Sequence, residues 1–224
     1  MIERYTLYET GKLRDRFHLS LGLPRGVKPS YNRRPNTLHP VIVSRDQKPT
    51  AERMLWGLLP KHAKNTNSIF RFKTYSVKSD AIFAKATTSE LIRTQRCLVP
   101  VNGFYMTTKT ADGAQTYYIT RQDKQLFSLA GVYDSWTQPD GVALPTFSIV
   151  TCEANDDLES IDARMPVLVH PDDEAIWTDP TVSDATSLYD IMRPCPNGVL
   201  SITLVDSAIA TTKKDTPDLI RPVA

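Results

Sequence analysis

The stretch RCLVPVNGFYM, residues 96–106, constrains the fold of this chain more than any other. A short apolar run ends at Pro100, and an aromatic run begins at Phe104. Between them, Asn102-Gly103 is the strongest two-residue turn signal for a β-hairpin, because both residue types tolerate the positive φ of a type I′ turn. By itself, the stretch predicts a hairpin in a β-rich fold.

Predicted strands outnumber predicted helices along the rest of the chain. Helices are predicted at 10–21, 83–93, 171–177 and 183–192. We find no linker, repeat or low-complexity segment in residues 1–224. We therefore expect a single α+β domain, with a bent, barrel-like sheet of mixed or antiparallel strands flanked by short helices. Apolar or alternating runs predict strands at 1–8, 40–43, 53–58, 116–121, 126–133, 145–152 and 199–205, with turns at Asp112-Gly113 and Asp140-Gly141.

Several classes of protein are disfavoured by composition. No run of eighteen apolar residues occurs, and the first ten residues lack the apolar core of a signal peptide, so we expect a cytoplasmic protein without a membrane span. Cys97, Cys152 and Cys195 have neither disulfide nor zinc spacing, and the histidines are scattered. Since no phosphate-binding loop or dinucleotide motif occurs either, we expect no metal and no cofactor.

Charge is distributed unevenly along the chain. Residues 1–100 contain 19 Lys and Arg against 7 Asp and Glu, and residues 101–224 contain 8 against 18, so the two parts carry +12 and −10. Residues 61–74 contain several basic and amide residues and no acid, which is typical of an exposed loop. A basic face could follow a phosphate backbone. Alternatively, the two parts neutralise each other in the folded protein.

Five motifs, in chain order, resemble those of the SRAP family, the SOS response-associated peptidases. They are WGLLP (56–60), RCLVPVNGFYM (96–106), FSLAGVYDSW (127–136), TFSIVTCEAN (146–155) and ARMPVLV (163–169). The resemblance covers nearly the whole chain. It implies a monomer with the α+β fold expected above and a role in DNA damage, because family members recognise abasic sites in single-stranded DNA.

The chemistry of the family depends on an N-terminal cysteine. The initiator Met is removed, and the α-amine of the Cys at position 2 attacks the aldehyde of a ring-opened abasic site. The thiol then closes a thiazolidine ring, which leaves a DNA–protein crosslink. An Asn in an N-A-R motif, a Glu after the F-Y of the central stretch and a His two places before R-M-P assist the reaction.

All four catalytic positions of the family are substituted in this chain. The start aligns without a gap, since Met1-Ile2-Glu3-Arg4-Tyr5 corresponds to M-C-G-R-[FY]. SVKSD (76–80) corresponds to N-A-R-[AS]-E in the same way. The replacements are Ile2 for the Cys, Ser76 for the Asn, Met106 for the Glu and Asp162 for the His.

These replacements remove the groups that the family's reaction needs. Ile2 has no nucleophile, and Met106 cannot transfer a proton. Asp has a reference pKa of ~3.9 against ~6.5 for His, so Asp162 is a poor proton donor near neutrality. Ser76 keeps a hydrogen-bonding group but loses the reach of an amide. We expect a pseudoenzyme that cannot form the family's covalent crosslink.

The resemblance also assigns residues to DNA binding. Trp56 would stack on an exposed base, although a core tryptophan on a strand is the alternative. Arg164 would contact a phosphate, although a fold-stabilising ion pair is the alternative. Lys78 keeps the charge of the family's Arg without its fork, and His62 replaces a second Trp. The assigned residues are Arg4, Pro35, Trp56, His62, Lys78 and Arg164, and in the loop YNRRP (31–35) Arg33 and Arg34 are phosphate contacts or solvated charges.

Three functions follow as hypotheses. The leading one is a non-covalent binder of single-stranded or abasic DNA. The second is an enzyme in which the α-amine of a retained Met1, with a reference pKa of ~7.7–8.0, forms a Schiff base with an abasic aldehyde and promotes β-elimination. The third is a scaffold that binds a protein partner and no longer touches nucleic acid.

Overall fold

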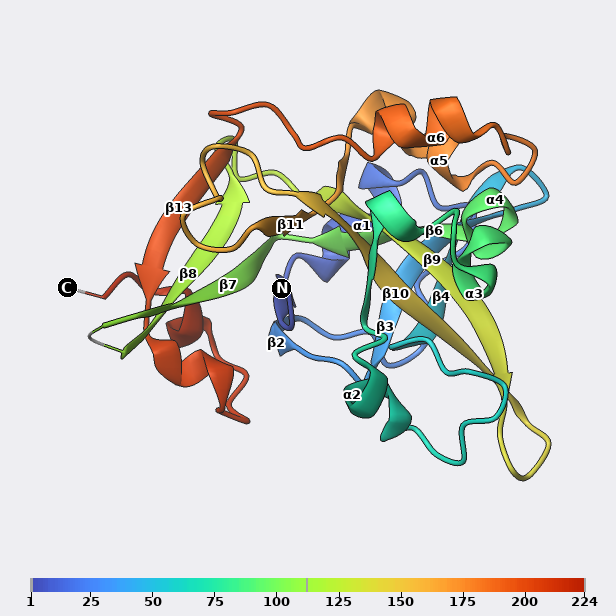
Figure 1. Ribbon diagram of the computed structural model, residues 1–224, viewed down its shortest axis with the longest axis horizontal. Helices are drawn as coiled ribbons and strands as arrows, with labels where there is room; N and C mark the ends of the chain where they lie inside the picture. Colours follow the sequence, from blue (N-terminus) through green and yellow to red (C-terminus); the bar gives the residue numbers. More distant parts are fainter. Residues whose placement is uncertain (1, 112, 224) are drawn as a thin grey trace.

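A closed five-stranded barrel forms the centre of the protein (Figure 1). The computed structural model describes residues 2–111 and 113–223. Strand β10 closes the ring, because it pairs antiparallel with β9 and parallel with β4. Short strands β5 (Ser76–Lys78) and β11 (Arg164–Pro166) add to β10, and β12 (Leu168–Val169) adds to β9. The barrel strands are β3 (Leu38–Arg45), β4 (Lys48–Trp56), β6 (Arg96–Val101), β9 (Phe127–Thr137) and β10 (Ala143–Glu153).

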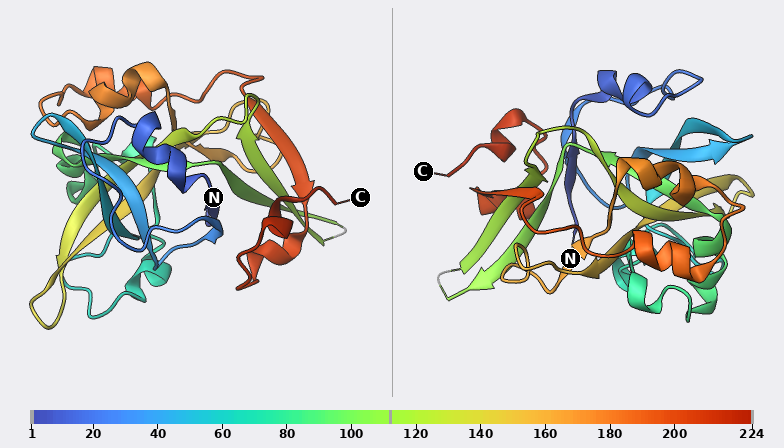
Figure 2. Two further views of the ribbon diagram at one scale, coloured as in Figure 1. Left: turned by 180° about the vertical axis from the view of Figure 1, so that it is seen from behind. Right: turned by 90° about the horizontal axis from the view of Figure 1, so that it is seen from above.

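A second, antiparallel sheet lies beside the barrel (Figures 1 and 2). One hydrophobic core extends from the barrel into this sheet. The expected α+β fold with a bent, barrel-like mixed sheet is therefore confirmed. The strands of the second sheet are, in spatial order, β13 (Leu200–Val205), β8 (Gly113–Arg121), β7 (Gly103–Thr110), β1 (Tyr5–Leu7) and β2 (Ser30–Arg33).

The hairpin predicted at 96–106 is wrong, because the two halves of this stretch belong to different sheets. Strand β6 pairs with β3 and β9 in the barrel, whereas β7 pairs with β1 and β8. Neither Asn102 nor Gly103 has the positive φ of a type I′ turn. Gly103 is needed for space instead, since a Cβ there would lie 2.6 Å from the carbonyl oxygen of Ile119. The central stretch thus joins the barrel to the second sheet.

Asn102 fixes this junction with its side chain. Its Oδ1 accepts the backbone N–H groups of Tyr8, at 2.8 Å, and Glu9, at 3.2 Å. Its Nδ2 donates to the Glu9 carboxylate at 2.8 Å. The residue that predicted a turn therefore holds the N-terminal segment against the start of β7.

Helices are shorter than the sequence patterns predict. The helix expected at 10–21 is a 3₁₀ turn followed by α1, and His18, two residues after its end, has φ of 50°. The helix therefore does not continue to Leu21, which is exposed rather than buried. The helix expected at 83–93 is two single turns, α3 and α4, whereas those at 171–177 and 183–192 are confirmed as helical. The predicted turn at Asp140-Gly141 joins β9 to β10, and Asp112 lies outside the described residues. The α-helices are α1 (Leu13–Arg16), α2 (Ser68–Phe72), α3 (Ala86–Ser89), α4 (Leu91–Thr94), α5 (Glu174–Thr178) and α6 (Ala185–Ile191).

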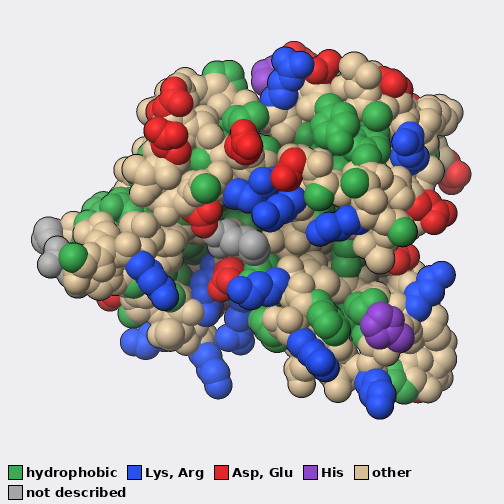
Figure 3. Space-filling view, viewed as in Figure 1, with side chains coloured by type: hydrophobic (Ala, Val, Ile, Leu, Met, Phe, Trp, Pro, Cys, Tyr) green, Lys and Arg blue, Asp and Glu red, His purple; other side chains and the backbone are tan. Residues whose placement is uncertain are grey.

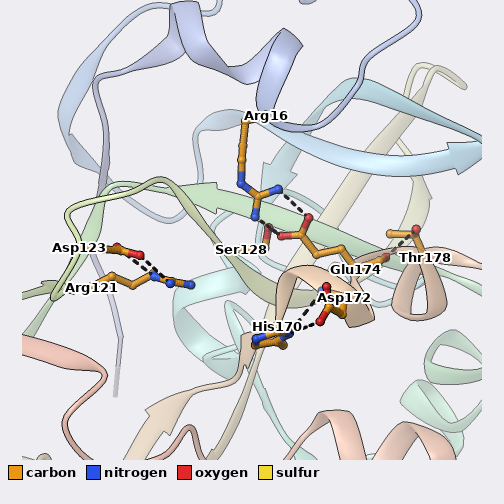
Figure 4. A network of polar contacts seen from close by, with 8 residues as sticks. All are labelled: Arg16, Arg121, Asp123, Ser128, His170, Asp172, Glu174 and Thr178. Atoms are coloured by element: carbon orange, nitrogen blue, oxygen red, sulfur yellow. Dashed lines mark hydrogen bonds and ion pairs between the residues drawn. The ribbon is translucent and has the colours of Figure 1, made fainter.

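A polar clamp attaches α5 to the barrel and to α1 (Figure 4). The Glu174 carboxylate accepts two bonds from Arg16, at 2.8 and 2.7 Å, and one from the Ser128 hydroxyl, at 2.6 Å. His170 pairs with Asp172 instead of Ser128, so the group does not have the order of a serine, histidine and acid triad. The clamp is structural, because a charge-assisted, bidentate pair with little exposure fixes both helices.

Candidate functional site

An open cleft of about 320 Å³ lies between the start of the chain, the loop before β3 and α2. Lys and Arg side chains are concentrated in the central and lower parts of the face shown in Figure 3, and Asp and Glu lie mostly above and to the right. The lining of the cleft combines two guanidinium groups, two aromatic rings, a proline and one carboxylate. Its residues are Glu3, Arg4, Arg34, Pro35, Phe70 and Tyr75.

Helix α2 presents two aromatic rings to solvent beside this cleft. Ile69 is fully buried and packs so closely on Gly57 that a Cβ there would lie 2.4 Å from the Ile69 side chain. Because Ile69 points inward, its neighbours Phe70 and Phe72 are 52% and 50% exposed. The guanidinium of Arg71 lies 5.3 Å from the Phe72 ring centroid. Exposed aromatic rings alternating with cations are suited to stacking on bases while nearby charges meet phosphates.

Arg4 reaches from the cleft to the C-terminal segment. Its Nη1 donates to Asn32 Oδ1 and its Nη2 to the carbonyl of Ala210, at 2.9 Å. Partial burial and the nearby positive charge of Arg34 lower the pKa of Arg4 from its usual value. Two guanidinium groups therefore lie close together in the lining of the cleft.

Tyr75 joins the start of the chain to the segment before β5. Its hydroxyl donates to Glu3 Oε1 at 2.7 Å, and burial, with this carboxylate, raises the pKa of the phenol. Its backbone carbonyl accepts the indole N–H of Trp56 at 2.8 Å. The end of β4, the start of β5 and the N-terminal segment thus meet at one residue.

Of the four positions that the resemblance assigns to catalysis, two are in the core. Ile2 is 2% exposed and Met106 is 1% exposed, and both belong to the main hydrophobic cluster. The segment before β1 runs beside β7, since the carbonyl of Arg4 accepts the N–H of Tyr105 at 3.0 Å. Apolar side chains at both positions therefore extend the core to the start of the chain, and Met1 lies outside the described residues.

The other two catalytic positions belong to a group around β5, β10 and β11. Ser76 is half-buried and Lys78 exposed, and both occupy one face of β5. Asp162 Oδ1 accepts the backbone N–H of Arg164 at 3.0 Å. The Arg164 side chain donates to the carbonyl of Thr151 at 2.6 Å and pairs with Asp80 at 3.0 Å. Of the two interpretations of Arg164, the structure shows the ion pair, which ties β11 to β10 and to the turn after β5.

The stacking interpretation of Trp56 is corrected by its environment. The side chain is 0% exposed, packs between Tyr5 and Phe147 and donates its only N–H inside the protein. Its ring therefore has no face open to a base, and the core alternative holds. Pro35 is buried but lines the cleft, and His62 is exposed in the loop before α2.

The cleft contains some of the predicted residues and several that were missed. Arg4 and Pro35 line it together with Arg34 of the YNRRP loop, whereas Trp56 lies beneath and Arg164 is engaged in the barrel. Phe70, Tyr75 and Glu3 were not predicted. The sequence signal for Phe70 is the alternation Phe70-Arg71-Phe72 within a stretch that lacks acids.

Other site types find no support in the described part of the chain. Within residues 2–111 and 113–223, no three His, Cys, Asp or Glu residues form a group that could hold a metal ion. No described helix is long and apolar enough to cross a membrane. The three cysteines are free, and burial raises the pKa of the Cys195 thiol to about 11, so it is a poor nucleophile near neutrality.

The fold and the cleft define a class of α+β protein with a closed five-stranded barrel and a cleft lined by arginines and aromatic rings between the N-terminal segment and α2. The sequence model of the SOS response associated peptidase (SRAP) family matches residues 1–212, and the chain therefore belongs to this family. It is 27% identical to the abasic site processing protein YoqW of Bacillus subtilis over 98% of this chain and 99% of that protein. It is 30% identical to the abasic site processing protein HMCES of Gallus gallus, over 88% of this chain and 67% of that protein.

A solved structure supports the fold independently. A Bacteroides thetaiotaomicron protein of 22% sequence identity matches with a TM-score of 0.88, over 99% of both chains. At this identity the match establishes the architecture alone.

Proposed function

We propose that this protein binds single-stranded DNA, including strands with an abasic site, in the cleft between the N-terminal segment and α2, and that it does so without a covalent bond. The observation that carries the proposal is the composition of this cleft. Arg4 and Arg34 supply positive charge, Phe70 supplies an exposed aromatic face, and the side chain at position 2 is a buried isoleucine. The choice of DNA with an abasic site as a ligand is supported by relatives that are named abasic site processing proteins.

The mode of binding follows from the residues that line the cleft. A single strand exposes its bases, so Phe70 can stack on one of them regardless of its identity. The guanidinium groups of Arg4 and Arg34 can then contact the neighbouring phosphates, since both residues line the same cleft. A missing base leaves an opening in the strand, which removes stacking on one side and makes the backbone easier to bend.

The proposal excludes the family's thiazolidine, because an isoleucine at position 2 has no thiol. Ile2 and Met106 are both core residues, so neither position offers a polar group to the cleft. A Met1 that is kept would offer its α-amine as a separate route to a Schiff base. The experiment below distinguishes it from plain binding.

The test compares one oligonucleotide, intact or with a single abasic site, on native and denaturing gels, with and without borohydride. We expect a salt-sensitive native shift and no band that survives denaturation under either condition. A band that appears only with borohydride identifies the Met1 amine as a nucleophile. A denaturation-resistant band without borohydride contradicts non-covalent binding. The absence of a native shift at low salt contradicts DNA binding and favours the scaffold hypothesis.

The cleft itself is tested with one variant and a matched control. Phe70→Ala removes the exposed ring at the cleft, and Tyr189→Ala removes a ring of similar exposure, 41%, on α6. We expect only Phe70→Ala to weaken binding of the oligonucleotide. Equal affinities of both variants and the wild type would place the strand elsewhere.

A further inference from the structure

A second cavity, of about 330 Å³, adjoins the cleft at Arg34, which lines both. It lies between the loop before β2, β2 itself, the start of β3 and the C-terminal segment. Four of its lining residues are cations and one is an acid. The residues used below are Lys28, Arg33, Arg34, His39, Lys213 and Asp215.

Arg33 is the unusual member of this cavity, because it is a cation at 8% exposure. It donates to the carbonyl of Lys28 at 2.7 Å, and its Nη1 lies 3.3 Å from His39 Nδ1. Its Nε is buried without a hydrogen-bond partner in the described structure. A buried guanidinium without full pairing is costly, so the site has an incomplete set of acceptors.

Charges of both signs surround Arg33. Burial lowers its pKa, Tyr5 and Asp215 act in the opposite direction, and the charge of Arg53 lowers it further. The guanidinium of Arg53 would lie 3.2 Å from a Cβ at Gly26, which lines the cavity. His39 is neutral, because burial and Arg33 lower its pKa to about 3. Asp215 is exposed and its Oδ1 accepts the N–H of Tyr31 at 2.5 Å.

Asp215 is the one carboxylate among the described lining residues, and the four cations outnumber it. In residues 2–111 and 113–223, none of Lys28, Arg33, Arg34, Arg53 or Lys213 forms an ion pair. Like charges grouped around a cavity repel one another and attract an anion. Guanidinium and ammonium groups that converge on one small space are the usual partners of phosphate oxygens.

We infer that this second cavity is a phosphate-binding subsite, built around Arg33 and rimmed by Lys28 and Lys213. Arg34 belongs to both cavities, so the phosphate that the second cavity binds comes from the strand that occupies the cleft. The strand leaves the cleft along β2 toward the C-terminal segment. The inference rests on the proposed function for the source of the phosphate, whereas the subsite itself stands on the cations alone.

Inorganic phosphate tests the subsite without DNA. The full chain is titrated at low ionic strength and followed by NMR on backbone amides, with chloride at matched ionic strength as the reference. We expect saturable shifts in residues 28–39 and 213–215 with phosphate only. These shifts disappear in Lys28→Glu/Lys213→Glu and in Arg33→Met, and remain in the control Lys109→Glu, an exposed lysine of β7. Shifts that are linear, or equal with chloride, overturn the subsite.

The salt dependence of oligonucleotide binding tests the source of the phosphate. The slope of log Kobs against log salt is negative. We expect it to become shallower by ~0.7 in Arg33→Met, as for one lost phosphate contact of a single strand. The same slope is measured in Lys28→Glu/Lys213→Glu, because the substituted side chains are exposed and Arg33 stays in place. Saturable phosphate binding with no DNA binding overturns the proposed function and identifies a site for free phosphate. DNA binding with an unchanged slope in both variants, and no saturable phosphate shift, overturns the subsite alone.

Discussion

Trp56 and Phe70 are aromatic residues on neighbouring elements, and their environments are opposite. Trp56, at the end of β4, is fully buried beneath the cleft, whereas Phe70, on α2, is 52% exposed and lines it. The close contact of Gly57 with Ile69 holds the two elements together. Trp56 therefore supports the cleft through its bond to Tyr75, and Phe70 is an exposed aromatic ring of the lining.

The same contrast holds between Ile2 or Met106 and Arg4. The first two fill the core at the start of the chain, while Arg4, two residues after Ile2, reaches into the cleft. Two positions that the resemblance assigns to catalysis are therefore core residues beside an arginine that lines the cleft. The predictions below test this division between a buried support and an exposed binding surface.

The largest expected effect separates Trp56 from Phe70 by stability. Trp56→Ala removes a fully buried ring and its hydrogen bond to Tyr75, so we expect the free energy of unfolding to fall by about 3–5 kcal/mol. Phe70→Ala should change it by less than about 0.5 kcal/mol, because the ring is half exposed. Urea denaturation followed by fluorescence measures both. Similar losses in the two variants would break the comparison.

The second prediction separates the same residues by affinity. Phe70→Ala should weaken binding of a single-stranded oligonucleotide by about 1–3 kcal/mol, the range for one base stacked on an aromatic ring. Fluorescence anisotropy at fixed salt measures the change, with Tyr189→Ala as the control. A loss of the same size in the control would show that any exposed ring on the surface has this effect.

The third prediction concerns His39, which contacts Trp56 edge-on and lies beside Arg33. Its folded-state pKa of about 3 is below the value of ~6.5 in the unfolded chain, so the unfolded state binds more protons between these values. Stability is therefore full above pH ~6.5 and falls as the pH is lowered. At pH ~5 we expect a loss of about 2 kcal/mol from this group.

Urea denaturation at pH ~7.5 and ~5 measures the loss, and His39→Gln is the control because it keeps a polar side chain that does not titrate. The groups around His39 are Arg33, Arg53, Thr37 and the carbonyl of Arg34. None of these groups is a carboxylate or a second imidazole. An equal loss in His39→Gln would assign the pH dependence to other residues.

The barrel could be predicted from the sequence, and its connection to the second sheet could not. Apolar runs such as 126–133 and 145–152 identify β9 and β10, because a buried strand has an apolar pattern wherever it pairs. Asn102-Gly103 led to the wrong prediction of a hairpin, because a turn signal reflects only local sequence. The pairing of β7 with β1 is set by space at Gly103 and by the bonds of Asn102 to residues far away in the chain.

The candidate site divides in the same manner. Arg4 and Pro35 could be found from the resemblance, since motif positions carry over with the fold. The burial of Trp56 and the exposure of Phe70 could not, because a sequence does not show which face of a one-turn helix is covered. Arg33 belongs to the same group, since an arginine in a polar loop predicts a solvated charge and the structure buries it.

The smallest effect is expected for restoring the missing thiol, Ile2→Cys. The substitution removes part of a buried side chain, so we expect about 1 kcal/mol of lost stability. We also expect no denaturation-resistant adduct with an abasic oligonucleotide. A thiol at this position would be placed in the core rather than in the cleft, and Met106, which the resemblance assigns to proton transfer, would remain apolar.

The same physics explains why one further substitution does not complete the reversion. A carboxylate from Met106→Glu would occupy a position that is 1% exposed, and burying it without a partner favours its protonated form or local unfolding. The double variant Ile2→Cys/Met106→Glu should therefore be less stable than either single variant and still form no adduct on denaturing gels. An adduct in Ile2→Cys alone would show that position 2 reaches the cleft despite its burial, and that the thiol is the one group the protein lacks.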